Sequence, residues 1–103
     1  MYYAVWASDR PGTLATRMRV REAHRARLRE PGAHPVRVVA GGPTLDASGA
    51  SMNGSLLVIQ ADSLDDVRAF LAEDPYQLEG VYARVEVRPW QWGLGRPDAD
   101  PAR

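Results

Sequence analysis

The stretch Gly54-Ser55-Leu56-Leu57-Val58-Ile59-Gln60-Ala61 decides how the rest of the chain is interpreted. Its unbroken aliphatic run, inside a segment of strand length, is typical of a β-strand that is covered on both faces. Ser63-Leu64-Asp65-Asp66 follows at once and predicts a helix start, because a serine can accept from first-turn amides and the two carboxylates favour the positive end of the helix dipole. Asp74-Pro75 is expected to end this helix, since the residue before a proline is biased away from the α region.

Three more strands are predicted from the distribution of apolar residues. Aromatic and β-branched residues dominate Tyr2 to Ala7, and valines alternate along His34 to Ala40. Val81 to Arg88 also alternates, which predicts two distinct faces. The residues expected to point inward are Val81, Ala83, Val85 and Val87, and those expected to point outward are Tyr82, Arg84, Glu86 and Arg88.

Turn residues delimit the remaining elements. Thr13 is expected to cap a long helix over residues 14–29, and Pro31-Gly32 ends that helix. Gly41-Gly42-Pro43 is expected to break the second strand, with a polar loop over residues 44–53 after it.

The resulting order βαββαβ predicts an α+β, ferredoxin-like fold, in which two helices cover one face of a four-stranded antiparallel sheet. With 103 residues, the chain is expected to form one domain over residues 1–92 and a flexible C-terminal tail over residues 93–103. Three strands carry apolar residues on both sides, and two helices cannot shield both faces of the sheet. We therefore expect a homodimer in which the sheets of two copies pack together.

Composition limits the chemistry that is available. All thirteen basic residues are arginine, and the chain contains neither lysine nor cysteine, which excludes thiolate catalysis, lysine Schiff bases and cysteine-ligated metals. The only histidines, His24 and His34, lie far apart in the sequence and make a poor ligand set. We therefore expect neither a metal nor an organic cofactor.

Charge and hydropathy point to a soluble, cytoplasmic protein. Residues 1–40 hold eight arginines against three acids, but residues 41–80 hold one arginine against seven acids, so the basic surplus of a nucleic-acid-binding domain is missing. The longest strictly aliphatic run, Leu56 to Ile59, is far too short to span a membrane. No targeting segment is evident near Met1, and the absence of cysteine fits a reducing compartment.

The long helix places polar residues on a face that should pack against the sheet. At about 100° per residue, Arg17, Arg21, His24 and Leu28 share one face with Leu14. In one interpretation the arginine stems extend to solvent and the imidazole bonds a backbone carbonyl. In the other, this face lines a pocket where the guanidiniums attract an anion and the imidazole transfers a proton.

Several short motifs along the chain resemble those of one protein family. They are the run from Arg17 to Leu28, Ala40-Gly41-Gly42-Pro43, Gly54-Ser55, Asp74-Pro75-Tyr76, Gly80-Val81-Tyr82 and Val87-Arg88-Pro89-Trp90. In order and spacing they resemble the YciI-like (YCII-related) family over the chain up to Trp92. The departures are an extra glycine at Gly41-Gly42-Pro43, a shorter polar loop after it and an unmatched tail.

The resemblance implies a dimeric α+β barrel with a ferredoxin-like fold. It also implies an active site built around a histidine and an aspartate, at the positions of His24 and Asp74. Asp9 matches a second place where the family often has an acid, so it is the reserve partner of the histidine. Most family members lack an assigned reaction, and the resemblance therefore names no substrate.

Together these residues predict a small-molecule enzyme that transfers protons with a His–Asp dyad. Asp74 would fix the tautomer of His24, so that the other ring nitrogen can take a proton. The substrate would be a lactone or ring-type organic acid that undergoes isomerisation or elimination. The residues expected to bind it are Arg17, Arg21, Gly42, Pro43, Ser55 and Tyr76.

Two other functions stay open at this point. A metabolite-binding or regulatory module would use the same pocket without turnover, and a cofactor-independent oxygenase would consume oxygen on the same fold. Outside the pocket, His34 is expected to be exposed, Trp90 and Trp92 to seal a subunit edge, and Tyr82 to serve the dimer contact.

Overall fold

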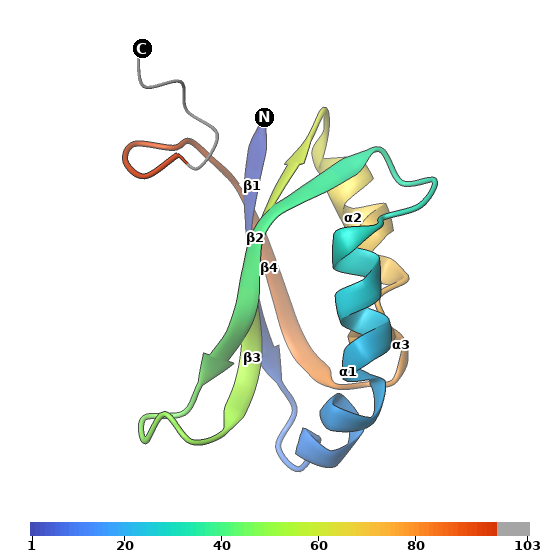
Figure 1. Ribbon diagram of the computed structural model, residues 1–103, viewed down its shortest axis with the longest axis vertical. Coiled ribbons are helices and arrows are strands. Elements are labelled where there is room, and N and C mark those ends of the chain that lie inside the picture. Colours follow the sequence, from blue (N-terminus) through green and yellow to red (C-terminus); the bar gives the residue numbers. More distant parts are fainter. Residues whose placement is uncertain (97–103) are drawn as a thin grey trace.

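Four antiparallel strands form one sheet, in the order β2-β3-β1-β4, in the computed structural model, which describes residues 1–96. The strands are β1 (Tyr2–Asp9), β2 (Val36–Leu45), β3 (Met52–Ala61) and β4 (Tyr82–Trp90). All helices lie on one side of this sheet (Figure 1), and they are α1 (Leu14–Arg29), α2 (Leu64–Ala72) and the short α3 (Pro75–Leu78). The predicted α+β class and the βαββαβ order are confirmed, with α3 as an addition between α2 and β4.

The core lies between the two central strands and the helices. Tyr3 of β1 pairs with Ile59 of β3, and both side chains point to the helix side, where they are buried. Phe70 of α2 packs into the same cluster and is 0% exposed. Burial of one such side chain contributes about 1.5–3 kcal/mol. A second cluster, which contains Ala7 and Tyr76, lies at the other end of the sheet and forms the floor of the site described below.

The helix caps agree with the sequence at one helix and not at the other. Ser63 caps α2 as predicted, because its hydroxyl accepts from the backbone N–H of Asp66 at 3.1 Å. Thr13 precedes α1, but its hydroxyl donates to the carbonyl oxygen of Arg10 at 2.7 Å and makes no cap bond. The predicted side-chain cap of the long helix is therefore wrong.

Strand β2 continues through Gly41-Gly42-Pro43, where the sequence predicts a break. Its pairing with β3 shifts between Val38 and Ala40, so one extra residue forms a bulge. Because β2 is an edge strand, Pro43 can lack its N–H without costing the sheet a hydrogen bond. The predicted loop over residues 44–53 shrinks accordingly, since β2 ends at Leu45 and β3 begins at Met52.

Strand β4 also changes its register, which moves a tyrosine to the other face. Ser8 pairs with Arg84, but Asp9 pairs with Tyr82, so Ala83 is the extra residue of a second irregularity. Tyr82 is 5% exposed and Ala83 is exposed, the reverse of the predicted alternation. The prediction that Tyr82 serves a dimer contact is therefore wrong.

One glycine is required where β3 approaches β1. A Cβ atom at Gly54 would lie 2.3 Å from the carbonyl oxygen of Ala7 and 2.5 Å from the hydroxyl of Thr44, so no side chain fits there. This close approach places Ser55, the next residue, at the end of the sheet where the polar side chains gather.

Within residues 1–96, no helix covers the sheet face away from α1 and α2 (Figure 1). Trp6 pairs with Leu56 across the strands, and these side chains are 52% and 43% exposed. Trp90, at the end of β4, is 38% exposed and lies against Trp92. The predicted excess of apolar residues on this second face is therefore present.

The predicted tail begins at Gly93, and residues 93–96 have no regular secondary structure. Its remainder, residues 97–103, lies outside the described residues. No helix in the described part of the chain combines the length and apolar character that a membrane span needs.

Candidate active site

Two polar side chains on the inner face of α1 are buried. Arg17 and His24 are 2% and 6% exposed, although each would ordinarily favour water. They are seven residues apart, or about two helical turns, so both project toward the end of the sheet where α3 begins. Polar groups at such depth need partners, and two aspartates supply them.

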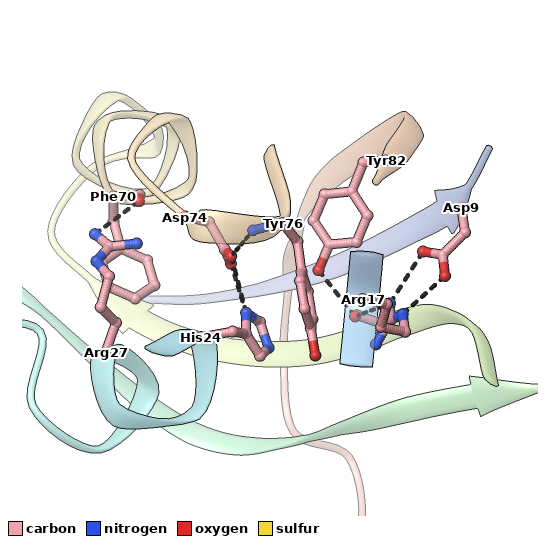
Figure 2. Close-up of polar contacts among 9 residues, drawn as sticks. Asp9, Arg17, His24, Arg27, Phe70, Asp74, Tyr76 and Tyr82 are labelled. Atoms are coloured by element: carbon pink, nitrogen blue, oxygen red, sulfur yellow. Dashed lines mark hydrogen bonds and ion pairs between the residues drawn. The ribbon is translucent and has the colours of Figure 1, made fainter. Parts of the chain in front are cut away.

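Asp74 holds His24 and caps a helix with the same carboxylate. Both of its oxygens lie 2.9 Å from Nδ1 of His24, and Oδ1 also accepts from the backbone N–H of Tyr76 at 2.8 Å (Figure 2). Because a carboxylate accepts hydrogen bonds, Nδ1 is the donor of this contact, and Nε2 is the ring nitrogen that Asp74 does not engage. The structure thus brings together the two residues of the predicted dyad, fifty positions apart in the sequence.

The ring of Tyr76 lies between a guanidinium and an imidazole. His24 stacks on one side, with 3.9 Å between ring centroids and 19° between the planes. The guanidinium carbon of Arg17 lies 4.3 Å from the centroid of the same ring, and Figure 2 shows it on the opposite side. These contacts fix the Tyr76 ring, which is 1% exposed.

Arg17 is in turn held by a buried polar network. Its Nε and Nη2 atoms donate to the two carboxylate oxygens of Asp9 at 2.7 and 3.0 Å, and Nη2 also donates to Ser55 at 2.9 Å. Tyr82 donates its own hydroxyl proton to Ser55 at 2.8 Å. Burial acts to lower the pKa of Arg17, but the hydrogen bond and charge of Asp9 outweigh it and raise that pKa.

Asp9 therefore contacts Arg17 and not His24. The acid that the family resemblance implied as a reserve partner of His24 instead neutralises a buried cation. Burial raises the pKa of Tyr82 well above its ordinary value, with the Asp74 charge acting in the same direction, so this phenol stays protonated at any physiological pH.

A cleft of about 280 Å³ opens beside this cluster. All of the predicted substrate-binding residues line it, together with His24: Arg17, Arg21, Gly42, Pro43, Ser55 and Tyr76. Asp74 and Asp9 do not line the cleft, and each influences it through the lining residue that it contacts, His24 or Arg17. A larger and more open hollow of about 650 Å³ lies beside β4, but no histidine or carboxylate lines it, so the dyad marks the smaller cleft as the candidate site.

Four lining residues were not identified from the sequence, whereas Leu28 was already placed on the helix face expected to line a pocket. They are Arg25, Arg29, Gly41 and Met52. Arg25 and Arg29 follow Arg21 at intervals of four, which puts all three along one edge of α1. This spacing could have predicted that Arg25 and Arg29 line the cleft. Met52 could not be predicted in this way, because it reaches the cleft only through the early start of β3.

Arg21 has a different environment from Arg17. It is half-buried at the cleft and makes no ion pair or hydrogen bond within residues 1–96. Its positive charge is therefore available to a ligand. No cluster of three or more histidine, aspartate or glutamate side chains within the described residues is arranged to hold a metal ion.

The second histidine lies outside this site. His34 contacts Glu73 through its Nε2 atom and the edge of Phe70 through its ring. It is only partly exposed, because its ring covers the end of α2.

The antiparallel sheet, the buried His–Asp pair and the cleft define a class of small α+β proteins with a histidine-based site. Residues 1–91 match the model of the YCII-related domain, and the chain belongs to this family. An uncharacterised protein of Haemophilus influenzae is 40% identical over 95 residues, which cover 88% of this chain and 97% of that protein. The protein YciI of Escherichia coli is 33% identical over 99 residues, with the same coverage of both chains.

Two solved structures resemble the fold. One is 5-chloro-2-hydroxyhydroquinone dehydrochlorinase (TftG) from Burkholderia phenoliruptrix, in complex with 2,5-dihydroxybenzoquinone, with a TM-score of 0.77 and 35% identity over 90% of this chain and 96% of that one. The other is the protein Atu4242 from Agrobacterium tumefaciens, with a TM-score of 0.52 and 14% identity over 85% of this chain and 89% of that one. The second likeness concerns the fold alone.

Proposed function

We propose that this chain is a small-molecule enzyme that uses His24 as a general base on a hydroxylated, anionic ring substrate. The observation that carries the proposal is the dyad: Nδ1 of His24 is held by both oxygens of Asp74, and the His24 ring lines the cleft. A base held in one tautomer by a carboxylate can contribute about 10²–10⁴ to a rate.

The proposed reaction needs one proton acceptor and one anion site. Nε2 of His24 takes a proton from a hydroxyl or an activated C–H group, and the electron pair of that bond stays on the substrate. In an elimination this pair forms a new double bond while a leaving group departs with its own pair, and the proton passes from His24 to solvent. In an isomerisation His24 returns the proton to another atom, and neither reaction requires a metal or an organic cofactor.

Arg21 is the residue that best suits the anionic group of the substrate. It borders the cleft and has no acid partner within residues 1–96, whereas the guanidinium of Arg17 is engaged by Asp9 and Ser55. A charge-assisted hydrogen bond from Arg21 would hold the substrate while the dyad acts. Pro43 would provide an apolar wall for the ring.

The dehydrochlorinase from Burkholderia supports this substrate class. Its ligand, 2,5-dihydroxybenzoquinone, is a ring with hydroxyl and carbonyl oxygens, and its reaction removes the elements of hydrogen chloride. The two chains are alike over nearly their full lengths. We extend to this protein the class of reaction, an elimination or isomerisation on an oxygenated ring, and take halogenated hydroquinones as its probe substrates.

The proposal also includes a homodimer. The uncovered sheet face carries Trp6, Leu56 and Trp90, which are exposed by 52, 43 and 38%. An apolar face of this kind on a small domain favours burial against a second copy. Stacked sheets would leave the cleft accessible, because it lies on the helix side.

The direct test offers the purified protein 5-chloro-2-hydroxyhydroquinone and related halogenated hydroquinones and follows the release of halide. We expect turnover by the native chain, a loss of about 10²–10⁴ in kcat for His24→Asn and native rates for His34→Asn. The second variant is matched, because it removes the only other histidine, which lies outside the cleft.

Two outcomes would contradict the proposal. Binding of 2,5-dihydroxybenzoquinone in the cleft without turnover of any substrate tested would indicate a binding module. Oxygen consumption with a reduced aromatic substrate, in place of halide release, would indicate an oxygenase.

A further inference from the structure

The cleft contains a second group that can exchange hydrogen bonds with a ligand, the hydroxyl of Tyr76. Two tyrosines meet edge to face here, with 5.7 Å between ring centroids. Tyr82 donates its hydroxyl proton to Ser55 at 2.8 Å. Tyr76 has no such acceptor within residues 1–96, and its side chain lines the cleft. Its O–H group is therefore available to a molecule bound there.

The Tyr76 hydroxyl and the free nitrogen of His24 are presented together. Figure 2 shows both of them on the side of the cluster that faces away from Asp74. The stacked rings lie only 3.9 Å apart, so one substrate of ring size can contact both groups at once. One carboxylate fixes their relative positions, because Asp74 accepts from Nδ1 of His24 and from the backbone N–H of Tyr76.

Charge near the hydroxyl favours an interaction with a developing anion. The titratable or charged groups that face Tyr76 are Arg17, Arg21 and His24 from α1, Asp74 at the start of α3 and Tyr82 from β4. Burial, helped by the Asp74 charge, raises the pKa of Tyr76, so the phenol is protonated near neutral pH. The charges of Arg17 and Arg21, and Arg17 as a hydrogen-bond donor to the phenol oxygen, act in the opposite direction. The result is a neutral donor near the guanidinium of Arg21, which makes no ion pair within the described residues.

We propose that the Tyr76 hydroxyl donates a hydrogen bond to the substrate oxygen on which negative charge develops as His24 removes the proton. The inference depends on the proposed function and adds a second catalytic residue to it. In this step the proton moves to Nε2 of His24, the electron pair moves onto the substrate oxygen, and Tyr76 keeps its own proton. A donor placed in advance at such an oxygen stabilises the transition state more than the ground state.

The test is Tyr76→Phe, which removes one oxygen atom and keeps the ring between Arg17 and His24. With the halogenated hydroquinone that the native chain turns over, we expect kcat to fall about 10²–10³-fold with KM changed less than threefold. The control is Tyr2→Phe, which removes the same atom from a hydroxyl that has no hydrogen-bond partner within residues 1–96 and lies outside the cleft. We expect native kinetics for this control.

A second variant separates catalysis from folding. Site-specific replacement of Tyr76 by 3-fluorotyrosine keeps the hydroxyl but makes it more acidic, so the alkaline limb of kcat/KM should move to lower pH. A tyrosine that only packs against His24 would leave that limb in place. Native kcat for Tyr76→Phe together with an unmoved alkaline limb would overturn the inference, even if His24→Asn is inactive. Full activity of His24→Asn would instead overturn the proposed function.

Discussion

Asp9 and Arg17 form a two-point ion pair whose side chains are only 7% and 2% exposed, at the wall of the cleft but outside the dyad. The pair keeps Arg17 against the ring of Tyr76, and that ring lies against His24. The two arginines of the site thus have different roles. Arg17 stabilises the wall of the cleft, and Arg21 faces the ligand.

Removal of the acid from this buried pair should destabilise the protein strongly. In Asp9→Asn the guanidinium of Arg17 stays buried without a countercharge, and we expect the free energy of unfolding to fall by about 3 kcal/mol in urea titrations. The matched control is Glu79→Gln, which breaks an exposed ion pair with Arg19 and should cost less than about 1 kcal/mol. Equal losses for the two variants would show that burial does not matter here.

Asp74→Asn should change the tautomer of His24 but leave the cap of α3 in place. The amide oxygen can still cap the helix, but the amide nitrogen would donate to Nδ1 and force the other tautomer. We expect kcat to fall about 10²–10⁴-fold with a small change in the melting temperature. Nitrogen-15 NMR of the imidazole should show the proton on Nδ1 in the native chain and on Nε2 in the variant.

Arg21→Gln should weaken the binding of anionic ligands with little effect on stability, because this guanidinium makes no ion pair within the described residues. We expect the Kd of 2,5-dihydroxybenzoquinone to rise about tenfold or more by calorimetry, with a larger effect at low salt. Arg19→Gln, on the exposed side of the same helix, is the control. An unchanged Kd for Arg21→Gln would exclude it as the anion site.

Stability should decline at alkaline pH because of Tyr82. Burial raises its pKa in the folded protein above the ordinary value of 10.0, so the folded state binds this proton more tightly than the unfolded state. The resulting stabilisation is fully present below pH 10 and is lost as the pH rises further. Urea titrations between pH 9 and 11 should show a steeper decline for the native chain than for Tyr82→Phe, and parallel declines would contradict this assignment.

Trp6→Arg should disrupt the proposed dimer without unfolding the chain. Position 6 lies opposite Glu86, a carboxylate that also contacts Arg84 and Arg88, so an arginine there places a charge in the sheet-to-sheet contact without facing an apolar neighbour on β4. Light scattering should give a dimer mass for the native chain at micromolar concentration and a monomer mass for the variant. A native chain that scatters as a monomer would exclude the dimer.

The sequence predicted the elements well where the apolar pattern was uninterrupted. The aliphatic run of β3 and the serine cap of α2 lie where they were expected. Tyr82 was misplaced because a register shift next to Ala83 changes which side chains face the helices. Such a shift depends on the partner strand and leaves no mark in the alternation of β4 itself.

The candidate site was predictable in its residue types and in one of its pairings. Helical spacing put Arg17 and His24 on one face, the family resemblance implied the pairing of His24 with Asp74, and the structure brings these two residues together. The pairing of Asp9 with Arg17 depends on how the end of β1 meets α1, which spacing along one helix does not reveal. The short helix α3 was not predicted, because its four residues contain too little periodicity to indicate a helix.

The close approach at Gly54 limits which positions around the cleft can be redesigned. Any larger residue there would push against the backbone of Ala7, and the displacement would reach Ser55 and the Arg17 network. Leu28 and Met52 also border the cleft but belong to none of its hydrogen bonds. A library that alters ligand preference should therefore vary these two apolar positions and keep the glycine constant.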